Sequence, residues 1–173
     1  MSTPNRAYVS VASNIEPEKN VLAALEALAD QVRVDAVSTF YVTAALGRPE
    51  QADYLNGVAR VETSYTPRGL RQTLREIEAG LGRVRTADKY AARPIDLDIL
   101  LFGTLVVRED DLTIPDPDLR SRAFLTACVL ELDRDLVLPD TGAPLEQAIN
   151  ADEVRKLEPA RTFTALLKER LGV

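Results

Sequence analysis

The architecture of this chain follows from one stretch, Arg93-Pro94-Ile95-Asp96-Leu97-Asp98-Ile99-Leu100-Leu101-Phe102-Gly103. Apolar and acidic residues alternate at its start, and a period of two is typical of a β-strand with one buried face. The apolar residues of the alternation are expected to point into a core, while Asp96 and Asp98 lie side by side on the opposite face. These apolar residues are Ile95, Leu97 and Ile99.

The two carboxylates of this strand repel each other, because alternate residues of a strand lie only about 7 Å apart. A hard divalent cation removes the repulsion, since Mg²⁺ prefers carboxylate oxygen and keeps room for substrate phosphates. The Asp-x-Asp pattern alone is a weak signal, because it also fits two solvated carboxylates on the wet face of an ordinary strand. Both interpretations stay open on this pattern alone.

A cationic segment lies just before the acidic strand. It contains Arg83, Arg85, Lys89 and Arg93. Such a loop can be merely solvated, but arginine is also the residue whose planar fork binds two phosphate oxygens at once. Beside an acidic pair that can hold Mg²⁺, these cations suit a polyphosphate. The two features together predict Mg²⁺-assisted transfer of a phosphoryl-type group.

Length and composition predict one domain, residues 1–173, that is long enough to bury a full core. The hydrophobic share of 46% and the charged share of 28% are ordinary for a folded globular chain. The net charge of −6 argues against a binder of nucleic acid or of membrane surfaces. Any site for anions must therefore be a local basic cluster.

Two residue types limit the possible chemistry. The chain has no histidine, which excludes Ser-His-Asp and Cys-His catalysis, histidine-ligated zinc and a histidine general base. Cys128 is the single cysteine, so it forms no disulfide within the chain and is expected to be a small core residue. Residues 1–6 lack the apolar run of a signal peptide, and no apolar stretch approaches the roughly 20 residues of a membrane span. We expect a cytoplasmic protein.

The remaining pattern predicts a β-α-β-β-α-β order. Strands are expected at about 7–12, 37–43, 54–63 and from 95 onward, and Val106-Val107 either extends the last of these or pairs beside it. Helices are expected from Pro17 to about Val32, from Pro67 to Leu81 with a stop at Gly82, over 118–132 and over 162–171. Residues 44–53 and 83–93 are expected to be loops. This order is typical of a ferredoxin-like α+β sandwich with a mainly antiparallel sheet and extra C-terminal helices, a fold that does not determine function.

Tyr54 and Asn56 share one face of the strand predicted at 54–63. An aromatic ring and an amide could stack on a flat heterocycle and hydrogen-bond to it, although the pair also fits an ordinary strand start after a turn. The chain contains neither the P-loop pattern nor Gly-x-Gly-x-x-Gly. The phosphates of any bound ATP would therefore depend on the arginines and on Mg²⁺.

At these residues the chain resembles the 6-hydroxymethyl-7,8-dihydropterin pyrophosphokinases of folate biosynthesis, from Tyr8 to Gly142. The resemblance rests on the combined spacing of several segments. They are Ser13-Asn14, Leu46-Gly47, Asp53-Tyr54-Leu55-Asn56, Ile77-Glu78, Gly82-Arg83-Val84-Arg85, Arg93-Pro94-Ile95-Asp96-Leu97-Asp98, Ile114-Pro115, Arg122 and Phe124.

The resemblance implies a ferredoxin-like fold and transfer of pyrophosphate from ATP to the pterin hydroxymethyl group, which gives AMP and the pterin diphosphate. It implies Arg83, Arg93, Asp96 and Asp98 as catalytic residues, and the two aspartates as the residues that hold two Mg²⁺ ions. The residues implied near the nucleotide are Glu78, Arg85, Ile99, Thr113, Asp116 and Arg122. The residues implied at the pterin are Thr43, Ala44, Ala45, Leu46, Gly47, Tyr54, Asn56 and Phe124. The expected partners are ATP and a pterin, with no nucleic acid or membrane, and the protein is expected to be a monomer or weak homodimer.

The chain departs from the family's usual pattern at several places. Ala12 replaces a usual glycine, Ala44-Ala45 replaces Pro-Pro, and Tyr90-Ala91-Ala92-Arg93 replaces Trp-Gly-Pro-Arg. Asp116 replaces a histidine that usually contacts a nucleotide phosphate, and Asp111 stands where some relatives have arginine. Two alternatives therefore stay open beside an active pyrophosphokinase. One is a pterin-binding paralogue with a changed substrate or lost catalysis, and the other is a non-catalytic ferredoxin-like ligand-binding module.

Overall fold

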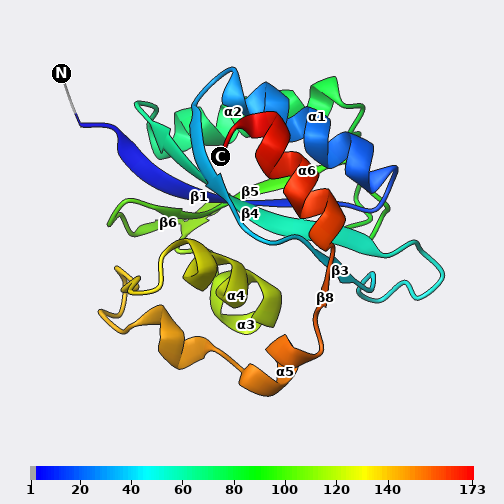
Figure 1. Ribbon diagram of the computed structural model, residues 1–173. Helices are drawn as coiled ribbons and strands as arrows, with labels where there is room; N and C mark the ends of the chain where they lie inside the picture. The colour runs from blue at the N-terminus through cyan, green and yellow to red at the C-terminus, as the bar shows by residue number, and fades with distance from the viewer. Residues whose placement is uncertain (1–2) are drawn as a thin grey trace.

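The computed structural model describes residues 3–173. Its strands are β1 (Asn5–Ser13), β2 (Arg33–Val37), β3 (Tyr41–Thr43), β4 (Tyr54–Thr63), β5 (Asp96–Phe102), β6 (Val107–Glu109), β7 (Leu112–Ile114) and β8 (Glu158–Pro159). Its helices are α1 (Pro17–Ala29), α2 (Pro67–Gly80), α3 (Asp118–Ser121), α4 (Ala123–Leu132), α5 (Ala151–Arg155), α6 (Arg161–Leu171) and the 3₁₀ turn η1 (Leu145–Ala148). A central sheet carries α1, α2 and α6 on one face and α3, α4 and α5 on the other (Figure 1).

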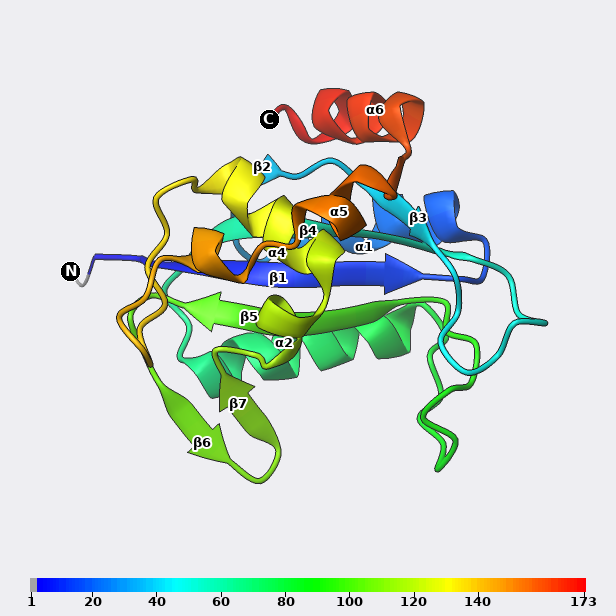
Figure 2. The same ribbon diagram turned by 90° about the horizontal axis from the view of Figure 1, so that it is seen from below.

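The sheet has the order β5-β1-β4-β3-β8, and β2 also pairs with β4. Every pairing in it is antiparallel. The strands β5, β1, β4 and β2, with α1 and α2 as their crossover helices, form the split βαβ arrangement, so the predicted ferredoxin-like fold is confirmed. The small strands β6 and β7 form a separate hairpin beside β5 (Figure 2).

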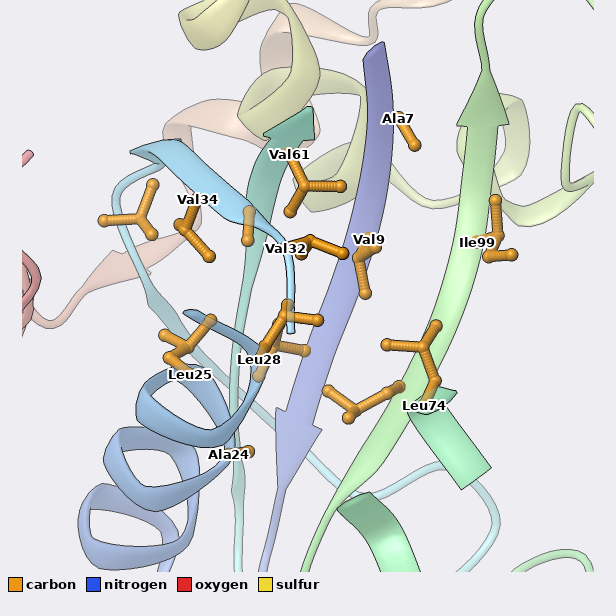
Figure 3. Packing of buried hydrophobic residues seen from close by; sticks show 14 of the residues in the cluster. Ala7, Val9, Ala24, Leu25, Leu28, Val32, Val34, Val61, Leu74 and Ile99 are labelled. Atoms are coloured by element: carbon orange, nitrogen blue, oxygen red, sulfur yellow. The ribbon is translucent and has the colours of Figure 1, made fainter. Parts of the chain in front are cut away.

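The main core lies between the sheet and the helices α1, α2 and α6. Figure 3 shows Leu25 and Leu28 of α1 and Leu74 of α2 packing against Val9 and other apolar residues of the sheet. The apolar residues of β5 and its entry are buried there, as predicted: Ile95, Leu97 and Ile99. The predicted start of α2 is also confirmed, because the Thr66 side chain accepts a hydrogen bond from the amide of Gly69 and Pro67 occupies the first turn. A second cluster, which contains Cys128, packs between the other sheet face and α3 and α4.

One predicted strand is wrong in its middle. Residues 37–43 do not form one strand, because β2 ends at Val37 and β3 begins at Tyr41. Between them, the ring of Phe40 occupies the space that a side chain at Gly57 would need, and the Ser38 hydroxyl accepts a hydrogen bond from the Val58 amide. The chain therefore runs along β4 through a bulge at residues 38–40, with Val37 opposite Ala59 and Tyr41 opposite Asn56.

The helix predicted over 118–132 is likewise divided. Arg122 is extended (φ −111°, ψ 110°) and separates α3 from α4. Val107 neither extends β5 nor pairs with it, but begins the β6–β7 hairpin. The helix predicted to reach Val32 ends at Ala29. The loops at 44–53 and 83–93 contain no strand or helix, as predicted. Within residues 3–173, none of the helices has both the length and the apolar character that a bilayer crossing requires.

Candidate active site

A cavity of about 280 Å³ opens above one face of the sheet. Its floor follows from strand register: Ala12 of β1 lies between Asp96 of β5 and Asn56 of β4, and Ser10 lies beside Asp98. Residues directly opposite in an antiparallel ladder share a face, so the acidic pair and Asn56 point into the same space. The small Ala12 side chain between them leaves that space open. The walls come from the loops 44–53 and 83–93, and from α3 and α4.

The two carboxylates differ in their partners. Arg83 donates to one oxygen of Asp96 at 2.5 Å, and Arg93 donates to the other at 2.6 Å. Asp98 forms no ion pair with any other residue in the range 3–173. Surrounding protein atoms, and then the charges of Asp96 and Asp116, raise the pKa of the Asp98 carboxyl, although solvent still reaches this residue from the cavity. Asp98 is therefore a carboxylate that gains from a cation.

Glu78 of α2 holds the start of the loop 83–93. It is almost fully buried, and it accepts hydrogen bonds from Arg83 at 3.0 Å, from Arg85 at 2.7 Å and from the Leu97 amide at 3.1 Å. Burial raises the pKa of Glu78 to about 7, while the Leu97 amide and Arg83 oppose this rise. Glu78 lies beneath the arginines that it binds and does not line the central cavity. It borders a second cavity with Arg83 and Arg85.

Asn14, just after β1, connects the two loops. Its side-chain nitrogen donates to Gln51 at 3.0 Å and to the Ala52 carbonyl at 3.3 Å, and its oxygen accepts from the Arg93 amide at 2.8 Å. Gln51 in turn donates to the carbonyl of Tyr90 at 2.8 Å. Both loops project beyond the same end of the sheet (Figure 2). This network positions Arg93 and the loop 44–53 relative to the strands.

The pterin residues implied by the resemblance mostly meet in the central cavity. Those that line it are Ala44, Ala45, Leu46, Tyr54, Asn56 and Phe124. Thr43 and Gly47 do not line it. Thr43 instead accepts a hydrogen bond from Asn56 at 2.9 Å, and Gly47 has a positive φ of 69° beside the ring of Tyr90.

The amide of Asn56 is held in one orientation. Its nitrogen donates to the Tyr41 carbonyl at 3.1 Å and to the Thr43 hydroxyl at 2.9 Å, which uses both of its N–H groups. No side-chain nitrogen or oxygen within residues 3–173 is both buried and without a partner. The Asn56 oxygen has no hydrogen-bond partner among these residues, so it is not fully buried. It is therefore available as an acceptor in the cavity that Asn56 lines.

The implied nucleotide residues are distributed over more than one cavity. Arg122 lines the central cavity, where its guanidinium lies 4.7 Å from the ring centre of Phe124. Ile99 and Thr113 border a narrower cavity of about 90 Å³ at the edge of the sheet, between β5, α2 and β7. Asp98 and Asp116 line both of these cavities. Arg85 lies with Glu78 in the second cavity along α2.

Comparison with known proteins shows the family of the chain. The sequence profile of the family described as 7,8-dihydro-6-hydroxymethylpterin-pyrophosphokinase (HPPK) matches residues 8–134. The chain belongs to the HPPK family. It is 38% identical over 138 residues to the 2-amino-4-hydroxy-6-hydroxymethyldihydropteridine pyrophosphokinase of Haemophilus influenzae, an alignment that covers 78% of this chain and 86% of the relative. Identity to the enzyme of the same name from Methylorubrum extorquens is 38% over 158 residues, or 90% and 95% of the two chains.

Solved structures show the same fold. Wild-type HPPK-DHPS of Plasmodium falciparum superposes with a TM-score of 0.70 at 11% identity, over 90% of this chain. This chain spans 46% of that longer chain. An HPPK-DHPS solved in complex with substrates gives a TM-score of 0.66 at 12% identity, and this chain spans 43% of it. The fold of an HPPK domain is therefore present here.

Several residues that line these cavities carry no distinct signal in the sequence. Arg71 and Arg75 of α2 border the narrow edge cavity, and Ser10 and Gln51 line the central one. Arg71 and Arg75 lie one helical turn apart beside the buried stripe of α2. Such a pair of arginines is typical of a solvated helix face and does not by itself indicate a site. Only the packing of α2 along the edge strand β5 shows where the two side chains lie.

The strand pair Asp96 and Asp98 supplies the candidate donors for a metal, and Asp116 and Asp118 line the same cavity. Within residues 3–173, no group of three or more histidine, cysteine, aspartate or glutamate side chains is arranged to hold a metal ion. Asp96 and Asp98 supply carboxylate oxygen, which suits Mg²⁺, and their number leaves coordination positions for phosphate oxygen and water. The pair therefore fits a metal that arrives with a polyphosphate better than a permanent, fully protein-bound ion.

Proposed function

We propose that this protein catalyses the Mg²⁺-dependent transfer of pyrophosphate from ATP to the hydroxymethyl group of 6-hydroxymethyl-7,8-dihydropterin, a step of folate biosynthesis. The observation that carries the proposal is the strand register that places Asp96 and Asn56 on either side of Ala12 in one cavity. Three paired residues of adjacent strands thereby present a carboxylate for metal binding on one side of Ala12 and a fixed amide acceptor on the other. Membership of the HPPK family supports this assignment.

The pterin would bind between the loop 44–53 and α4. The amide oxygen of Asn56 can accept hydrogen bonds from the amino and ring N–H groups of a pterin. Tyr54 and Phe124 offer aromatic surface to a flat ring, and Arg122 over Phe124 adds a planar cation at the same wall. Tyr41 and Thr43 already orient the Asn56 side chain, so this side chain loses little conformational freedom when the pterin binds.

The phosphates would bind at the arginines around Asp96. Asp96 and Asp98 would hold two Mg²⁺ ions, which supply charge neutralisation for the phosphate oxygens when bound. Arg83 and Arg93 already converge on this point, each within hydrogen-bond distance of Asp96. Their planar forks are suited to the oxygens of the transferred group. Glu78 keeps Arg83 and Arg85 in place from below.

The reaction would be an in-line displacement. The pterin hydroxymethyl oxygen forms a bond to the β-phosphorus of ATP as the bond from that phosphorus to the α-phosphate oxygen breaks. AMP leaves, and the hydroxyl proton is released. No side chain is needed as nucleophile, and a loose transition state needs no strong general base, which agrees with a chain that lacks histidine. ATP would bind first, and the two linked loops would then complete the pterin pocket.

The direct test is product analysis with purified protein, ATP, Mg²⁺ and 6-hydroxymethyl-7,8-dihydropterin. The proposal predicts AMP and pterin diphosphate in equal amounts, with formation of both dependent on pterin and abolished by EDTA. Formation of ADP, or no consumption of ATP at any pterin concentration, would contradict it.

A pterin-binding paralogue without this chemistry is the second candidate, because Asp116 adds a negative charge beside Asp98 where a polyphosphate would bind. Calorimetry distinguishes the two functions. An enzyme with ordered binding should bind pterin well only when Mg²⁺ and a non-hydrolysable ATP analogue are present. A simple pterin binder should bind equally well without nucleotide.

A further inference from the structure

The proposed nucleotide end of the site is acidic, and the arginines of the loop 83–93 do not line it. Asp98, Asp111 and Asp116 all border the narrow cavity at the edge of β5. ATP carries several negative charges, so an acidic rim would weaken its binding unless cations stand close by. Neither Arg83 nor Arg93 lines this cavity, and both donate hydrogen bonds to Asp96 instead.

Two arginines of α2 face these acids. Arg71 and Arg75 border the narrow cavity, and both also border the second cavity along α2. They follow the buried residues Leu70 and Leu74 and are one helical turn apart, so they lie together at the margin of the packed stripe. The sheet ends at β5, and this margin of α2 therefore comes close to the acids on the other side of the edge.

The two arginines differ in their freedom. Arg71 forms an ion pair with Asp111 at 3.3 Å, and Arg68 also binds Asp111 at 3.0 Å. Arg75 makes no ion pair within residues 3–173, although it is only partly exposed. A partly exposed arginine without an anionic partner is well prepared to bind a phosphate.

The second cavity, of about 460 Å³, continues this cationic surface. Arg71, Arg75, Arg83 and Arg85 line it, and Glu78 is the single acid among its lining residues. Glu78 is already bound by Arg83 and Arg85. A chain with a net charge of −6 thus has a groove along α2 with four arginines against one carboxylate. Such a local excess of positive charge is expected where an anion binds.

We propose that Arg75, with Arg71 beside it, binds a phosphate of the nucleotide from α2 and thereby compensates for the negative charge of Asp116. This inference rests on the proposed function, because it takes ATP as the ligand. The segment after β7 carries the acidic Asp116 in this chain. The inference therefore assigns the binding of this phosphate to cations of the helix α2.

The test is the affinity for Mg²⁺ with a non-hydrolysable ATP analogue, measured by calorimetry for wild-type protein, Arg75→Gln, Arg75→Lys and Arg134→Gln. Arg134 is exposed, forms no ion pair within residues 3–173 and lines none of the three cavities, so it controls for the loss of one positive charge. Loss of a charge-assisted hydrogen bond predicts about tenfold or more weaker binding for Arg75→Gln. Arg75→Lys should recover part of the affinity, and Arg134→Gln should match wild type.

A double substitution tests the compensation itself. Adding Asp116→Asn to Arg75→Gln should restore nucleotide affinity several-fold, because the unbalanced negative charge is then removed. Pterin affinity and melting temperature should not change with Arg75→Gln. Equal nucleotide affinity in Arg75→Gln and Arg134→Gln would overturn the inference. If wild-type protein forms AMP in that case, the proposed function stands without it. If wild-type protein forms no AMP but Arg75→Gln still weakens nucleotide binding, Arg75 binds the nucleotide and the proposed reaction is wrong.

Discussion

The proposed pterin end and the proposed nucleotide end of this site are built in different ways. At the pterin end, a neutral amide on β4 is fixed by two hydrogen bonds and faces aromatic side chains. At the nucleotide end, charged side chains from α2, β5 and the segment after β7 surround a narrow cavity at the edge of the sheet. Recognition of a flat heterocycle needs fixed donors and acceptors, whereas recognition of a polyphosphate needs a balance of charge that different elements can supply.

Asp96 and Asp98 lie where the two ends meet, so the largest effect is expected there. Asp98→Asn should lower turnover by about a hundredfold or more, because preorganised charge at a phosphoryl group is lost. The melting temperature should not fall, since the substitution also relieves repulsion from Asp96 and Asp116. Steady-state AMP formation and thermal unfolding together check this prediction.

A matched control for that variant is Asp118→Asn. Asp118 lines the same central cavity but comes from α3, and it is not on the acidic strand. It should change turnover by no more than a few-fold. Similar losses in the two variants would mean that the cavity responds to total charge and not to the strand pair.

The second prediction concerns Glu78, which lies beneath Arg83 and Arg85, and the pH dependence of stability. Because the pKa of Glu78 is raised to about 7 in the folded protein, the fold binds this proton more tightly than the unfolded chain does. The free energy of unfolding should therefore fall as the pH rises from about 4.5 to about 7, with a contribution from Glu78 on the order of 3 kcal/mol. Urea unfolding at several pH values checks this, and Glu78→Gln should show a flatter profile over that range. An unchanged profile in the variant would remove Glu78 as the cause.

A third prediction separates the pterin end from the nucleotide end. Asn56→Ala should weaken pterin binding about tenfold or more, because the fixed acceptor is lost. Thr43→Val removes one of the two groups that orient this amide, and should weaken pterin binding by a smaller factor, about threefold. Nucleotide affinity should be unchanged in both variants. Calorimetry with each ligand gives the answer, and an equal loss for both ligands would mean that the two ends are not separate.

The smallest effect is expected at Asp116. Asp116→Asn keeps an oxygen for the hydrogen bond from the Asp118 amide but removes the charge. Nucleotide binding should become about threefold tighter, and Asp116→His should tighten it as well, because one repulsive charge near the phosphates is gone. Weaker nucleotide binding in both variants would show that the carboxylate contributes a favourable contact.

The sequence predicts those parts of the molecule whose signals are local. The alternation in β5, the bounds of β4 and the start of α2 depend on side-chain period and on Thr66 and Pro67, and all are observed. The break between β2 and β3 depends instead on the contact of Phe40 with Gly57, which are 17 positions apart in the chain. The break at Arg122 has no comparable signal in the residues around it. The short strands β7 and β8 were also not predicted.

The same distinction holds for the candidate site. The strand pair and the cationic loop could be identified because their residue types are unusual for their positions. The hydrogen bonds of Asn14 to two distant loops, and the position of Arg75 at the edge of β5, depend on the tertiary arrangement of α2 and the loops. Such residues carry ordinary local patterns, so the sequence gives them no separate signal.

The central claim is that Asp96 and Asp98 hold the metal that brings the two ends together. The most direct measurement is the number of Mn²⁺ ions bound in the presence of a non-hydrolysable ATP analogue and pterin, followed by electron paramagnetic resonance in wild-type protein and in Asp98→Asn. The account predicts two ions per wild-type chain, and the loss of at least one in the variant. The same number of bound ions in both proteins would contradict it.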